Sequence, residues 1–395
     1  MTKPVSVTKR LTPAALGYRM PAEWEPHAAT WIAWPHNRMD WPDKFTPIPW
    51  VYGEIARRLA QSESVCILAG SKAEEARAVH KLKSAGANLA AIKFFRIPTD
   101  RVWTRDYGPV FLRREAGRSS KHDEVAIVRF RFNGWAKYPD CKRDAAVAEA
   151  AANALDCALV KARAGDRDFV LEGGSIDMNG EGAVITTEEC LLDPKVQTRN
   201  PGLARQEIEA ALSENLGVNQ VIWLGRGIAG DDTHGHVDDF CRFVNPRTVV
   251  LCQETDPQDA NYLPLQENRE RLEQVRLKCG SRLEVIPLPM PGPLYFRGQR
   301  LPASYANFYI ANRVVLVPTF NDAHDRTALG ILTELFPDRA VIGIHAVDLV
   351  WGLGTLHCLT QQQPAGALAR PGNFRMTRRR SARLNISKES RGQPS

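Results

Sequence analysis

The chain alternates between short apolar runs and amphipathic stretches over most of its length. Residues 64–70 form a continuous apolar run that predicts a buried strand, and residues 71–86 predict a helix that begins after Ser71 and ends at Gly86. The same succession returns further along the chain. Helices are predicted at 142–156, 202–217, 259–278 and 322–336, and strands at 89–97, 124–132, 157–162, 182–192, 220–225 and 340–347.

Two predicted hairpins interrupt this alternation. Residues 241–254 predict two strands joined by a turn at Asn245 and Pro246, and residues 306–320 predict a second hairpin. Hairpins mixed with single helices argue against a simple parallel dinucleotide-binding sheet, and no complete glycine-rich phosphate loop is present. The pattern therefore predicts an α/β fold in which a ββαβ unit recurs.

A chain of 395 residues with eight scattered cysteines is long enough for one large domain or two. No apolar run approaches the roughly 20 residues that span a bilayer, and the N-terminus lacks the apolar core of a signal peptide. The cysteines contain no CxxC pair, which argues against a disulfide framework or a structural zinc site. We therefore expect a cytoplasmic protein without membrane contact, most of whose thiols are buried as small apolar side chains.

The net charge of +7 resides at the C-terminus. Residues 370–395 hold eight Lys and Arg residues and one acid, so the rest of the chain is neutral. This tail has few apolar residues and no sustained period, and we predict that it is disordered. The distribution predicts no specific nucleic-acid partner, although the tail itself could bind anionic polymers without specificity.

Two polar clusters lie near the ends of predicted strands. In residues 102–111, Arg105 and Asp106 stand among apolar and aromatic neighbours, where burial is costly unless the charges are satisfied, for instance by an internal bridge. In residues 169–180, Glu172 ends an apolar strand and precedes two glycines. This pattern indicates either a carboxylate that faces a closely approached site or a turn with an exposed side chain.

A third cluster, residues 227–240, holds four aspartates and two histidines. Along an extended strand, His234, His236 and Asp238 would share one face. The HxH segment could hold a divalent metal, as in metal-dependent amidohydrolases, but no convincing set of further ligands is found. Alternatively, His236 is a general acid/base and the carboxylates bind an organic cation.

A guanidinium substrate would connect these clusters to a cysteine. Its planar group offers five N–H donors, which match paired carboxylates such as Asp106 and Asp238. Its central carbon is then an electrophile suited to a thiolate, and the bound cation and a protonated His236 would both favour the charged sulfur. Cys358 follows a glycine-rich turn at 352–354 that could leave its sulfur exposed, which separates it from the other seven cysteines.

Six ordered motifs resemble those of the agmatine deiminases, which belong with the bacterial-type peptidylarginine deiminases in the guanidino-group-modifying superfamily. The resemblance covers about residues 18–365, so we place a catalytic domain at 18–366, an N-terminal extension at 1–17 and the basic tail at 367–395. The motifs are MPAEWEPHAATWIAWP (20–35), VWTRDYGP (102–109), LEGGSID (171–177), DDTHGHVDDFCRFV (231–244), LPASYANFYIAN (301–312) and GLGTLHCLTQQQP (352–364).

The resemblance implies a fold and a set of catalytic residues. The implied fold is a five-bladed α/β propeller, or pentein, with pseudo-fivefold ββαβ repeats. The catalytic residues that it implies are the nucleophile Cys358, the general acid/base His236, the carboxylate Glu172 that orients this histidine, and the guanidinium-binding pair Asp106 and Asp238.

The resemblance also implies the substrate and the reaction. Asp232 matches a position that helps bind agmatine, and Trp103 matches an aromatic residue beside the substrate channel. The implied hydrolysis needs no cofactor and no metal: Cys358 attacks the guanidinium carbon, His236 protonates the departing ammonia, and water then cleaves a covalent thiouronium. Agmatine would give N-carbamoylputrescine and ammonia, a step towards putrescine in polyamine biosynthesis.

Departures from the family pattern keep alternatives open. The agmatine enzymes commonly have GGGNIHC before the nucleophile, whereas this chain carries Leu353 and Thr355 in place of a glycine and an asparagine. Peptidyl arginine or another small guanidine is therefore the alternative substrate, and a metal-dependent amidohydrolase is the alternative of another class. We further expect a homodimer, an Asp239 that is solvated or salt-bridged, an Arg105 that supports Asp106, and a structural His357.

Overall fold

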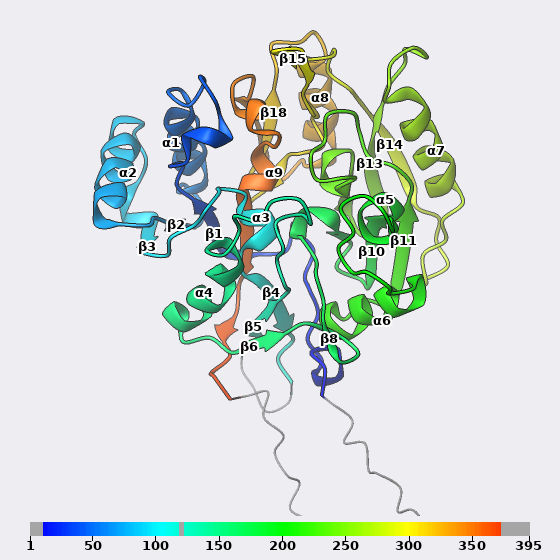
Figure 1. Ribbon diagram of the computed structural model, residues 1–395, viewed down its shortest axis with the longest axis horizontal. Helices are drawn as coiled ribbons and strands as arrows, with labels where there is room; N and C mark the ends of the chain where they lie inside the picture. The colour runs from blue at the N-terminus through cyan, green and yellow to red at the C-terminus, as the bar shows by residue number, and fades with distance from the viewer. Residues whose placement is uncertain (1–10, 118–121, 373–395) are drawn as a thin grey trace, which may run out of the picture.

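The computed structural model describes residues 11–117 and 122–372. The first ten residues of the predicted extension and residues 373–395 of the predicted tail lie outside this part. The described chain is a mixed α/β fold built on five sheets of three or four strands. Figure 1 shows these sheets grouped around two short central helices, α3 (Thr104–Tyr107) and α9 (Leu356–Leu359), with the longer helices on the outside.

Four of the sheets share one connectivity. A first strand pairs antiparallel with the second, and the second pairs parallel with a third strand that follows one or two helices. The sheets, with their helices, are β4 (Val110–Arg114), β5 (Glu124–Arg129), α4 (Val147–Leu155), β6 (Leu159–Lys161); β9 (Asp177–Met178), β10 (Ala183–Thr187), α5 (Glu188–Leu192), α6 (Arg205–Leu216), β11 (Gln220–Leu224); β12 (Cys241–Asn245), β13 (Thr248–Gln253), α7 (Tyr262–Glu273), β14 (Glu284–Pro289); and β17 (Tyr309–Ile310), β18 (Val314–Thr319), α8 (Asp325–Leu335), β19 (Ala340–His345).

The fifth sheet joins the two ends of the described chain. Its parallel strands β1 (His27–Ala33), β2 (Ser64–Leu68) and β3 (Ile92–Phe95) alternate with α1 (Ile48–Leu59) and α2 (Lys72–Ser84). Strand β20 (Thr360–Pro364) comes directly after α9 and pairs antiparallel with β1. This pairing fixes the segment that carries Cys358 against the start of the fold. Two further strand pairs are β7 (Arg163–Ala164) with β8 (Arg167–Asp168), and β15 (Tyr295–Phe296) with β16 (Gln299–Arg300).

Most of the predicted elements are present, because local signals set them. Helix α2 begins where expected, since the Ser71 side chain accepts a hydrogen bond from the Glu74 amide at 3.2 Å. Both predicted hairpins form, as β12–β13 and β17–β18. The strand predicted at 182–192 is too long, because the Thr187 side chain accepts a hydrogen bond from the Cys190 amide and starts α5 there.

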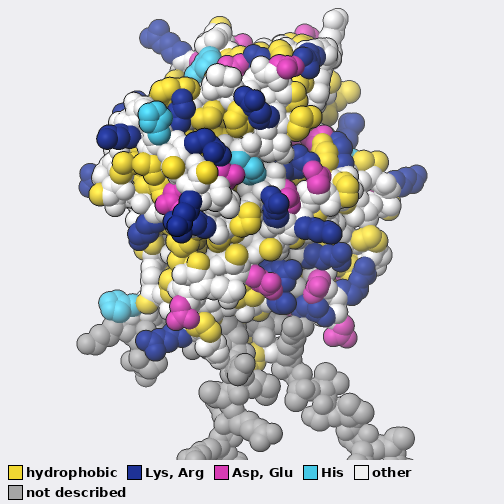
Figure 2. All heavy atoms as spheres, turned by 60° about the vertical axis from the view of Figure 1, so that its left-hand side comes forward, with side chains coloured by type: hydrophobic (Ala, Val, Ile, Leu, Met, Phe, Trp, Pro, Cys, Tyr) yellow, Lys and Arg dark blue, Asp and Glu magenta, His cyan; other side chains and the backbone are white. Residues whose placement is uncertain are grey.

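The folded chain continues a few residues past the predicted boundary at 366. Ala367 and Leu368 form β21, which pairs parallel with β5, and Ala369 is buried. Within the described residues, no helix is both long enough and apolar enough to cross a membrane. On the face shown in Figure 2, basic side chains are interspersed with acidic and apolar ones.

Candidate active site

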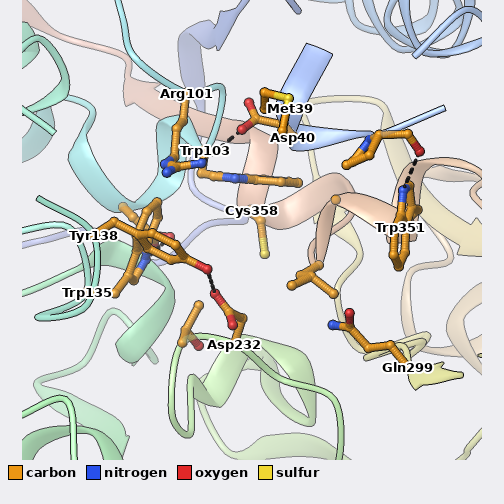
Figure 3. Close-up of a pocket in the computed structure, with 15 residues that line it drawn as sticks. Met39, Asp40, Arg101, Trp103, Trp135, Tyr138, Asp232, Gln299, Trp351 and Cys358 are labelled. Carbon is orange, nitrogen blue, oxygen red and sulfur yellow. Dashed lines mark hydrogen bonds and ion pairs between the residues drawn. The ribbon is translucent and has the colours of Figure 1, made fainter. Parts of the chain in front are cut away.

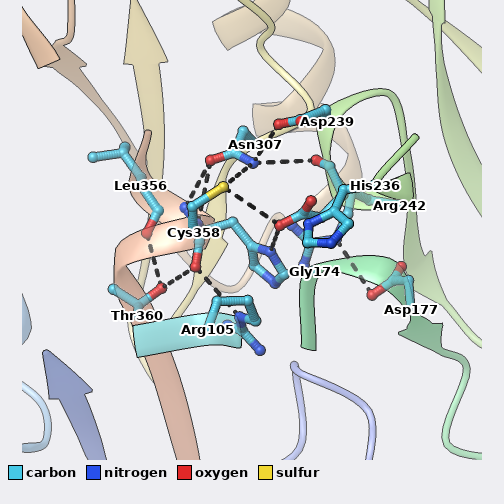
Figure 4. Close-up of polar contacts among 12 residues, drawn as sticks. Arg105, Gly174, Asp177, His236, Asp239, Arg242, Asn307, Leu356, Cys358 and Thr360 are labelled. Carbon is cyan, nitrogen blue, oxygen red and sulfur yellow. Dashed lines mark hydrogen bonds and ion pairs between the residues drawn. The ribbon is translucent and has the colours of Figure 1, made fainter. Parts of the chain in front are cut away.

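Segments far apart in the sequence bring the five predicted catalytic side chains together, and all five are buried. Each stands on a short helix or directly before one, and Figure 4 shows His236 and Cys358 on facing sides of the same group of polar side chains. They are Asp106 on α3, Glu172 before the 3-10 helix η5 (Gly173–Ser175), His236 before and Asp238 on the 3-10 helix η6 (Val237–Asp239), and Cys358 on α9.

The turn before Cys358 requires glycine at two positions. A Cβ atom at Gly352 would lie 2.6 Å from the Trp41 ring, and one at Gly354 would lie 2.8 Å from the Trp103 ring. Leu353, between them, adopts a left-handed conformation with φ of 68°, which is unfavourable for a residue with a side chain. Glycine here serves close packing against the two indole rings rather than exposure of the sulfur, because Cys358 is buried.

His236 lies between two carboxylates. Its Nδ1 is 3.7 Å from Asp106 Oδ1, and its Nε2 is 3.7 Å from Glu172 Oε2. Burial alone would lower the pKa of His236, but the Asp106 carboxylate and contacts with Cys190 and Glu172 raise it well above its ordinary value. The imidazole is thus held in its protonated form, as a general acid requires.

Arg199 determines the charge of Glu172. Its Nε lies 3.2 and 3.3 Å from the two carboxylate oxygens, and both side chains are fully buried. Burial would raise the pKa of Glu172, but the Arg199 guanidinium and His236 lower it overall. Glu172 is therefore an anion that faces the histidine and is itself held by a buried cation.

The two aspartates of the predicted guanidinium pair converge on the same point. A Cβ at Gly174 would lie 2.9 Å from Asp106 Oδ1 and 3.1 Å from Asp238 Oδ1. Asp106 accepts hydrogen bonds from the Gly174 amide at 3.1 Å and Trp135 Nε1 at 3.0 Å. Asp238 Oδ2 contacts His357 Nδ1 at 2.6 Å, whereas its Oδ1 has no hydrogen-bond partner among the described residues.

Their pKa values differ because their neighbours differ. Burial, with the nearby Asp238 and Glu172 carboxylates, raises the pKa of Asp106 to about 6 against the opposing effect of His236. Burial would also raise the pKa of Asp238, but His357 lowers it overall. The site thus offers one firmly ionised carboxylate with an unpaired oxygen beside a second carboxyl that is mostly ionised at neutral pH and that a bound cation would ionise fully.

Cys358 lies against this pair. Its Sγ is 3.7 Å from Asp238 Oδ2 and accepts a hydrogen bond from Asn307 Nδ2 at 3.2 Å. Burial and the carboxylates of Asp238, Asp239 and Asp106 raise the pKa of the thiol well above its ordinary value. In this state the sulfur is therefore a thiol, and a positive charge is needed nearby to make it a thiolate.

A cavity of about 220 Å³ leads to the sulfur. In Figure 3 the Cys358 side chain points into its centre from beneath Trp103, and Asp106 lies in its wall. Asp238 and His236 do not line the cavity but lie directly behind Asp106 and Cys358. The remaining lining residues are Met39, Asp40, Pro42, Arg101, Trp135, Tyr138, Asp232, Thr233, Gln299, Trp351, Gly352 and Leu353.

Asp232 lies across the cavity from Trp103 (Figure 3) and is already engaged. The Tyr138 hydroxyl donates to its Oδ2 at 2.7 Å, and the Lys137 ammonium pairs with its Oδ1. Both predicted binding residues, Trp103 and Asp232, thus lie in the wall of the cavity that reaches Cys358. An incoming cation at Asp232 would meet Lys137.

Two expectations about neighbouring residues, those for Arg105 and Asp239, are wrong. Arg105 does not bridge Asp106: its Nη2 is 3.0 Å from Glu23, to which His357 Nε2 also lies at 2.8 Å. His357 therefore joins Asp238 to a buried ionic network. Asp239 is not solvated: it is buried, it accepts a hydrogen bond from Asn307, and burial with the neighbouring Asp238 raises its pKa well above its ordinary value.

The HxH segment is not an extended strand. His234 has φ of 64° and Gly235 has φ of 89°, so the chain turns between the two histidines. His234 Nε2 pairs with Asp193 at 2.9 Å, away from His236. In the parts of the chain that the structure describes, the groups with ligand atoms close enough to share a metal ion are Glu172 with Cys190 and His236, and Asp238 with Asp239 and Cys358; neither includes His234.

Several residues of the site were not predicted from the sequence. Trp135 follows an Asn-Gly pair, and Asn307 lies within the motif at 301–312, so a signal existed for both. Arg199 and Cys190 carry no such signal, because they stand in ordinary polar and helical contexts. Only the fold brings them to Glu172 and His236.

Comparison with known proteins assigns the chain to a family. The Porphyromonas-type peptidyl-arginine deiminase family matches residues 19–364. Agmatine deiminase of Ectopseudomonas mendocina is 37% identical over 382 residues, which cover 91% of this chain and 98% of the relative. Agmatine deiminase of Pseudomonas aeruginosa strain LESB58 is 38% identical over 378 residues, with 90% and 97% covered.

Solved structures agree with the sequence matches. The agmatine deiminase of Enterococcus faecalis is 30% identical, with a TM-score of 0.80 over 91% of this chain and 98% of that one. A cysteine-to-serine variant of C. jejuni agmatine deiminase with substrate bound is 30% identical, with a TM-score of 0.76 over 89% and 97%. With the family match spanning nearly the whole described chain, this protein belongs to the Porphyromonas-type peptidyl-arginine deiminase family.

Proposed function

We propose that this chain hydrolyses a guanidino group without a cofactor, and that agmatine is its substrate. The observation that carries the proposal is the convergence of Cys358 Sγ, Asp238 and Asp106 at the end of one cavity, with His236 held between two carboxylates directly behind. A thiol surrounded by acids suits a substrate that is itself a cation. The predominance of agmatine deiminases among the relatives described above supports agmatine.

The guanidinium is proposed to bind between Asp106 and Asp238. Asp238 Oδ1 is buried without a hydrogen-bond partner among the described residues, and an unsatisfied buried anion is costly. Guanidinium N–H groups would satisfy it and, together with Asp106, form the charge-assisted pairs that this planar group prefers. This placement sets the guanidinium carbon beside the sulfur, because Sγ is 3.7 Å from Asp238.

Substrate binding is proposed to activate the nucleophile. The guanidinium neutralises the acids that hold Cys358 as a thiol in the empty site, so the pKa of the thiol falls and its proton passes to solvent, which leaves the thiolate. The thiolate then attacks the guanidinium carbon and forms a C–S bond. His236 gives its proton to the leaving nitrogen, the C–N bond breaks, ammonia departs, and a thiouronium remains on Cys358.

The second half of the reaction uses the same groups. His236, now neutral, takes a proton from water, and the resulting hydroxide attacks the thiouronium carbon. The C–S bond breaks with its electron pair on sulfur, the proton of the new hydroxyl group passes to solvent, and the ureido product N-carbamoylputrescine leaves the restored thiolate. Glu172, anchored by Arg199, is proposed to hold the imidazole in place and to stabilise its protonated form.

Asp232 and Trp103 are proposed to bind the rest of the substrate. The methylene chain would pack along the Trp103 ring, and the terminal ammonium would take the position of the Lys137 ammonium on Asp232. Free arginine would bring a carboxylate to this acidic wall. That unfavourable encounter favours agmatine over arginine as the small substrate.

We further propose that the five sheets form the blades of a five-bladed propeller. The repeated antiparallel-then-parallel connectivity supports this arrangement, as does the pairing of β20 with β1, which would close the ring. The family match at 19–364 supports a single catalytic domain near 18–366. The homodimer and the cytoplasmic location stay predictions.

A substrate panel tests the proposed function. Agmatine, arginine and an arginine-containing peptide are assayed for ammonia and ureido product before and after exhaustive chelation. We expect turnover of agmatine that survives chelation and is lost in Cys358→Ser but retained in Cys66→Ser, a matched buried cysteine of the β2 strand. Turnover of only the peptide would overturn the substrate assignment, and activity that depends on metal and survives in Cys358→Ser would overturn the mechanism.

A further inference from the structure

We propose that Asn307 is a further catalytic residue, whose side-chain amide donates a hydrogen bond to the sulfur of Cys358 and stabilises the thiolate. This inference rests on the proposed role of Cys358 as the nucleophile. Asn307 lies just before β17 and is buried, 51 residues before the cysteine. Figure 4 shows its amide directed at the sulfur from the side opposite Arg105.

The contacts of the amide fix which end faces the sulfur. Asn307 Oδ1 accepts hydrogen bonds from the backbone amides of His357 at 3.1 Å and Cys358 at 3.4 Å, and from the Thr355 hydroxyl at 2.8 Å. A backbone N–H can only donate, so a flipped amide would set its NH₂ against two donors. The oxygen must therefore face α9, and the NH₂ group must face Cys358 Sγ at 3.2 Å and Asp239 Oδ1 at 3.0 Å.

The sulfur needs such a donor because its other polar neighbours are acids. Asp238 and Asp239 have oxygens in the same compact group as Sγ, and Asp106 faces the same cavity. Within residues 11–117 and 122–372, Asn307 is the side chain whose N–H donates to this sulfur. A neutral amide can stabilise the thiolate without repelling the guanidinium, whereas Lys or Arg at this position would compete with the substrate.

Thr355 is proposed as the positioning residue for this donor. Its hydroxyl, buried at the start of α9, holds Asn307 Oδ1 and so directs the opposite end of the amide at the sulfur. Thr355 does not touch Sγ in any described hydrogen bond, so its effect must pass through Asn307. A serine keeps this hydroxyl, and a valine removes it with little change of shape.

The test measures the thiolate directly, without agmatine. Cys358 is alkylated by iodoacetamide over a range of pH in the substrate-free protein, with Cys358→Ser as the blank for the other thiols. Asn307→Asp keeps the acceptor for the α9 amides and removes the donor, and Asn307→Ala removes the donor without adding a negative charge that would itself raise the pKa of the thiol, so both variants should shift the profile in the same direction. We expect the apparent pKa of Cys358 to rise by at least one unit, alkylation at pH 8 to slow roughly 10- to 100-fold, and kcat to fall while KM for agmatine changes less than about threefold.

The positioning role has its own readout. Thr355→Val should shift the alkylation profile in the same direction by a smaller amount, and Thr355→Ser should restore it. If a folded Asn307→Asp protein has the wild-type alkylation profile, the inference is wrong. If that variant does not fold, a wild-type profile in Thr355→Val overturns it instead. Alkylation that depends on Asn307 in a protein that does not turn over agmatine would refute the proposed substrate and leave the thiolate donor in place.

Discussion

Gly174 offers the sharpest test of the proposed site, because its lack of a side chain is what allows three of the proposed catalytic groups to meet. A Cβ at this position would lie 2.5 Å from His236 Nδ1, 2.9 Å from Asp106 Oδ1 and 3.1 Å from Asp238 Oδ1. Its backbone amide also donates to Asp106. Gly174→Ala therefore perturbs the acid/base and the guanidinium pair together, without changing any of their side chains.

The expected loss of activity follows from the overlap between the added Cβ of Gly174→Ala and the His236 ring. An ordinary contact of a Cβ begins near 3.4 Å, so the imidazole or the backbone must move by about 0.9 Å. A displacement of about 1 Å in a catalytic group can lower the rate roughly 100-fold. Overpacking of a buried site costs about 1–3 kcal/mol of stability, which a protein of this size can lose and still fold.

For each variant, kcat/KM for ammonia release from agmatine and the free energy of unfolding in urea are measured and compared with the wild-type values. We expect Gly174→Ala to fold with a modest loss of stability and to lose roughly 100-fold in kcat/KM. Gly330→Ala in α8 is the control, because nothing lies within 4 Å of its Cβ position; it should gain up to about 1 kcal/mol and keep full activity. A folded Gly174→Ala variant within threefold of wild-type activity would refute the proposed convergence of His236, Asp106 and Asp238.

Three further changes test other parts of the structure. Leu353→Gly relieves a left-handed backbone but removes a partly buried side chain that packs against the core, so it should stabilise less than Asp156→Gly, at φ of 48°, for which we expect a gain of about 1 kcal/mol in the free energy of unfolding. Only Leu353→Gly, in the cavity wall, should weaken the preference for agmatine over arginine, and equal preferences in both variants would contradict this. Lys137→Met should lower KM for agmatine about two- to fivefold by freeing Asp232, with no change for an alkylguanidine that lacks the ammonium. Burial raises the pKa of Asp144 to about 7, so the stability that its protonated carboxyl contributes is fully present below about pH 4 and is lost as the pH rises through about 7. Asp144→Asn, which stays neutral, should therefore raise the free energy of unfolding in urea more at pH 8 than at pH 4. An equal difference at the two pH values would refute the raised pKa.

The elements that the sequence predicted well are those with complete local signals. Ser71 caps α2 and Gly217 ends α6 in a left-handed conformation, so a few consecutive residues define each boundary. The strand predicted at 182–192 was too long because one hydroxyl, that of Thr187, outweighed the apolar run. The five proposed catalytic positions could be named from the sequence, because each stands in an ordered motif.

The surroundings of those positions were not identifiable. An extended HxH segment was a fair expectation from the alternation of residues, yet the left-handed turn at His234 and Gly235 separates the two histidines. Arg105 and Asp106 are adjacent in sequence, yet Arg105 pairs with Glu23, which the fold delivers from 82 residues away. Neighbours in sequence share a backbone, and only packing decides which charges share a buried space.

The sequence alone determined which side chains are present for the proposed reaction: a cysteine after a glycine-containing turn, a histidine, and several carboxylates that can bind a cation. What the tertiary structure decided is the protonation and orientation of each group, because these depend on burial and on partners that come from distant segments. His357 reaches Glu23 across 334 residues and holds Asp238 as an anion, and Asn307 reaches Cys358 across 51. Electrostatic energies depend on the distance between charges in space and on the exclusion of water, and the order of residues along the chain gives neither quantity.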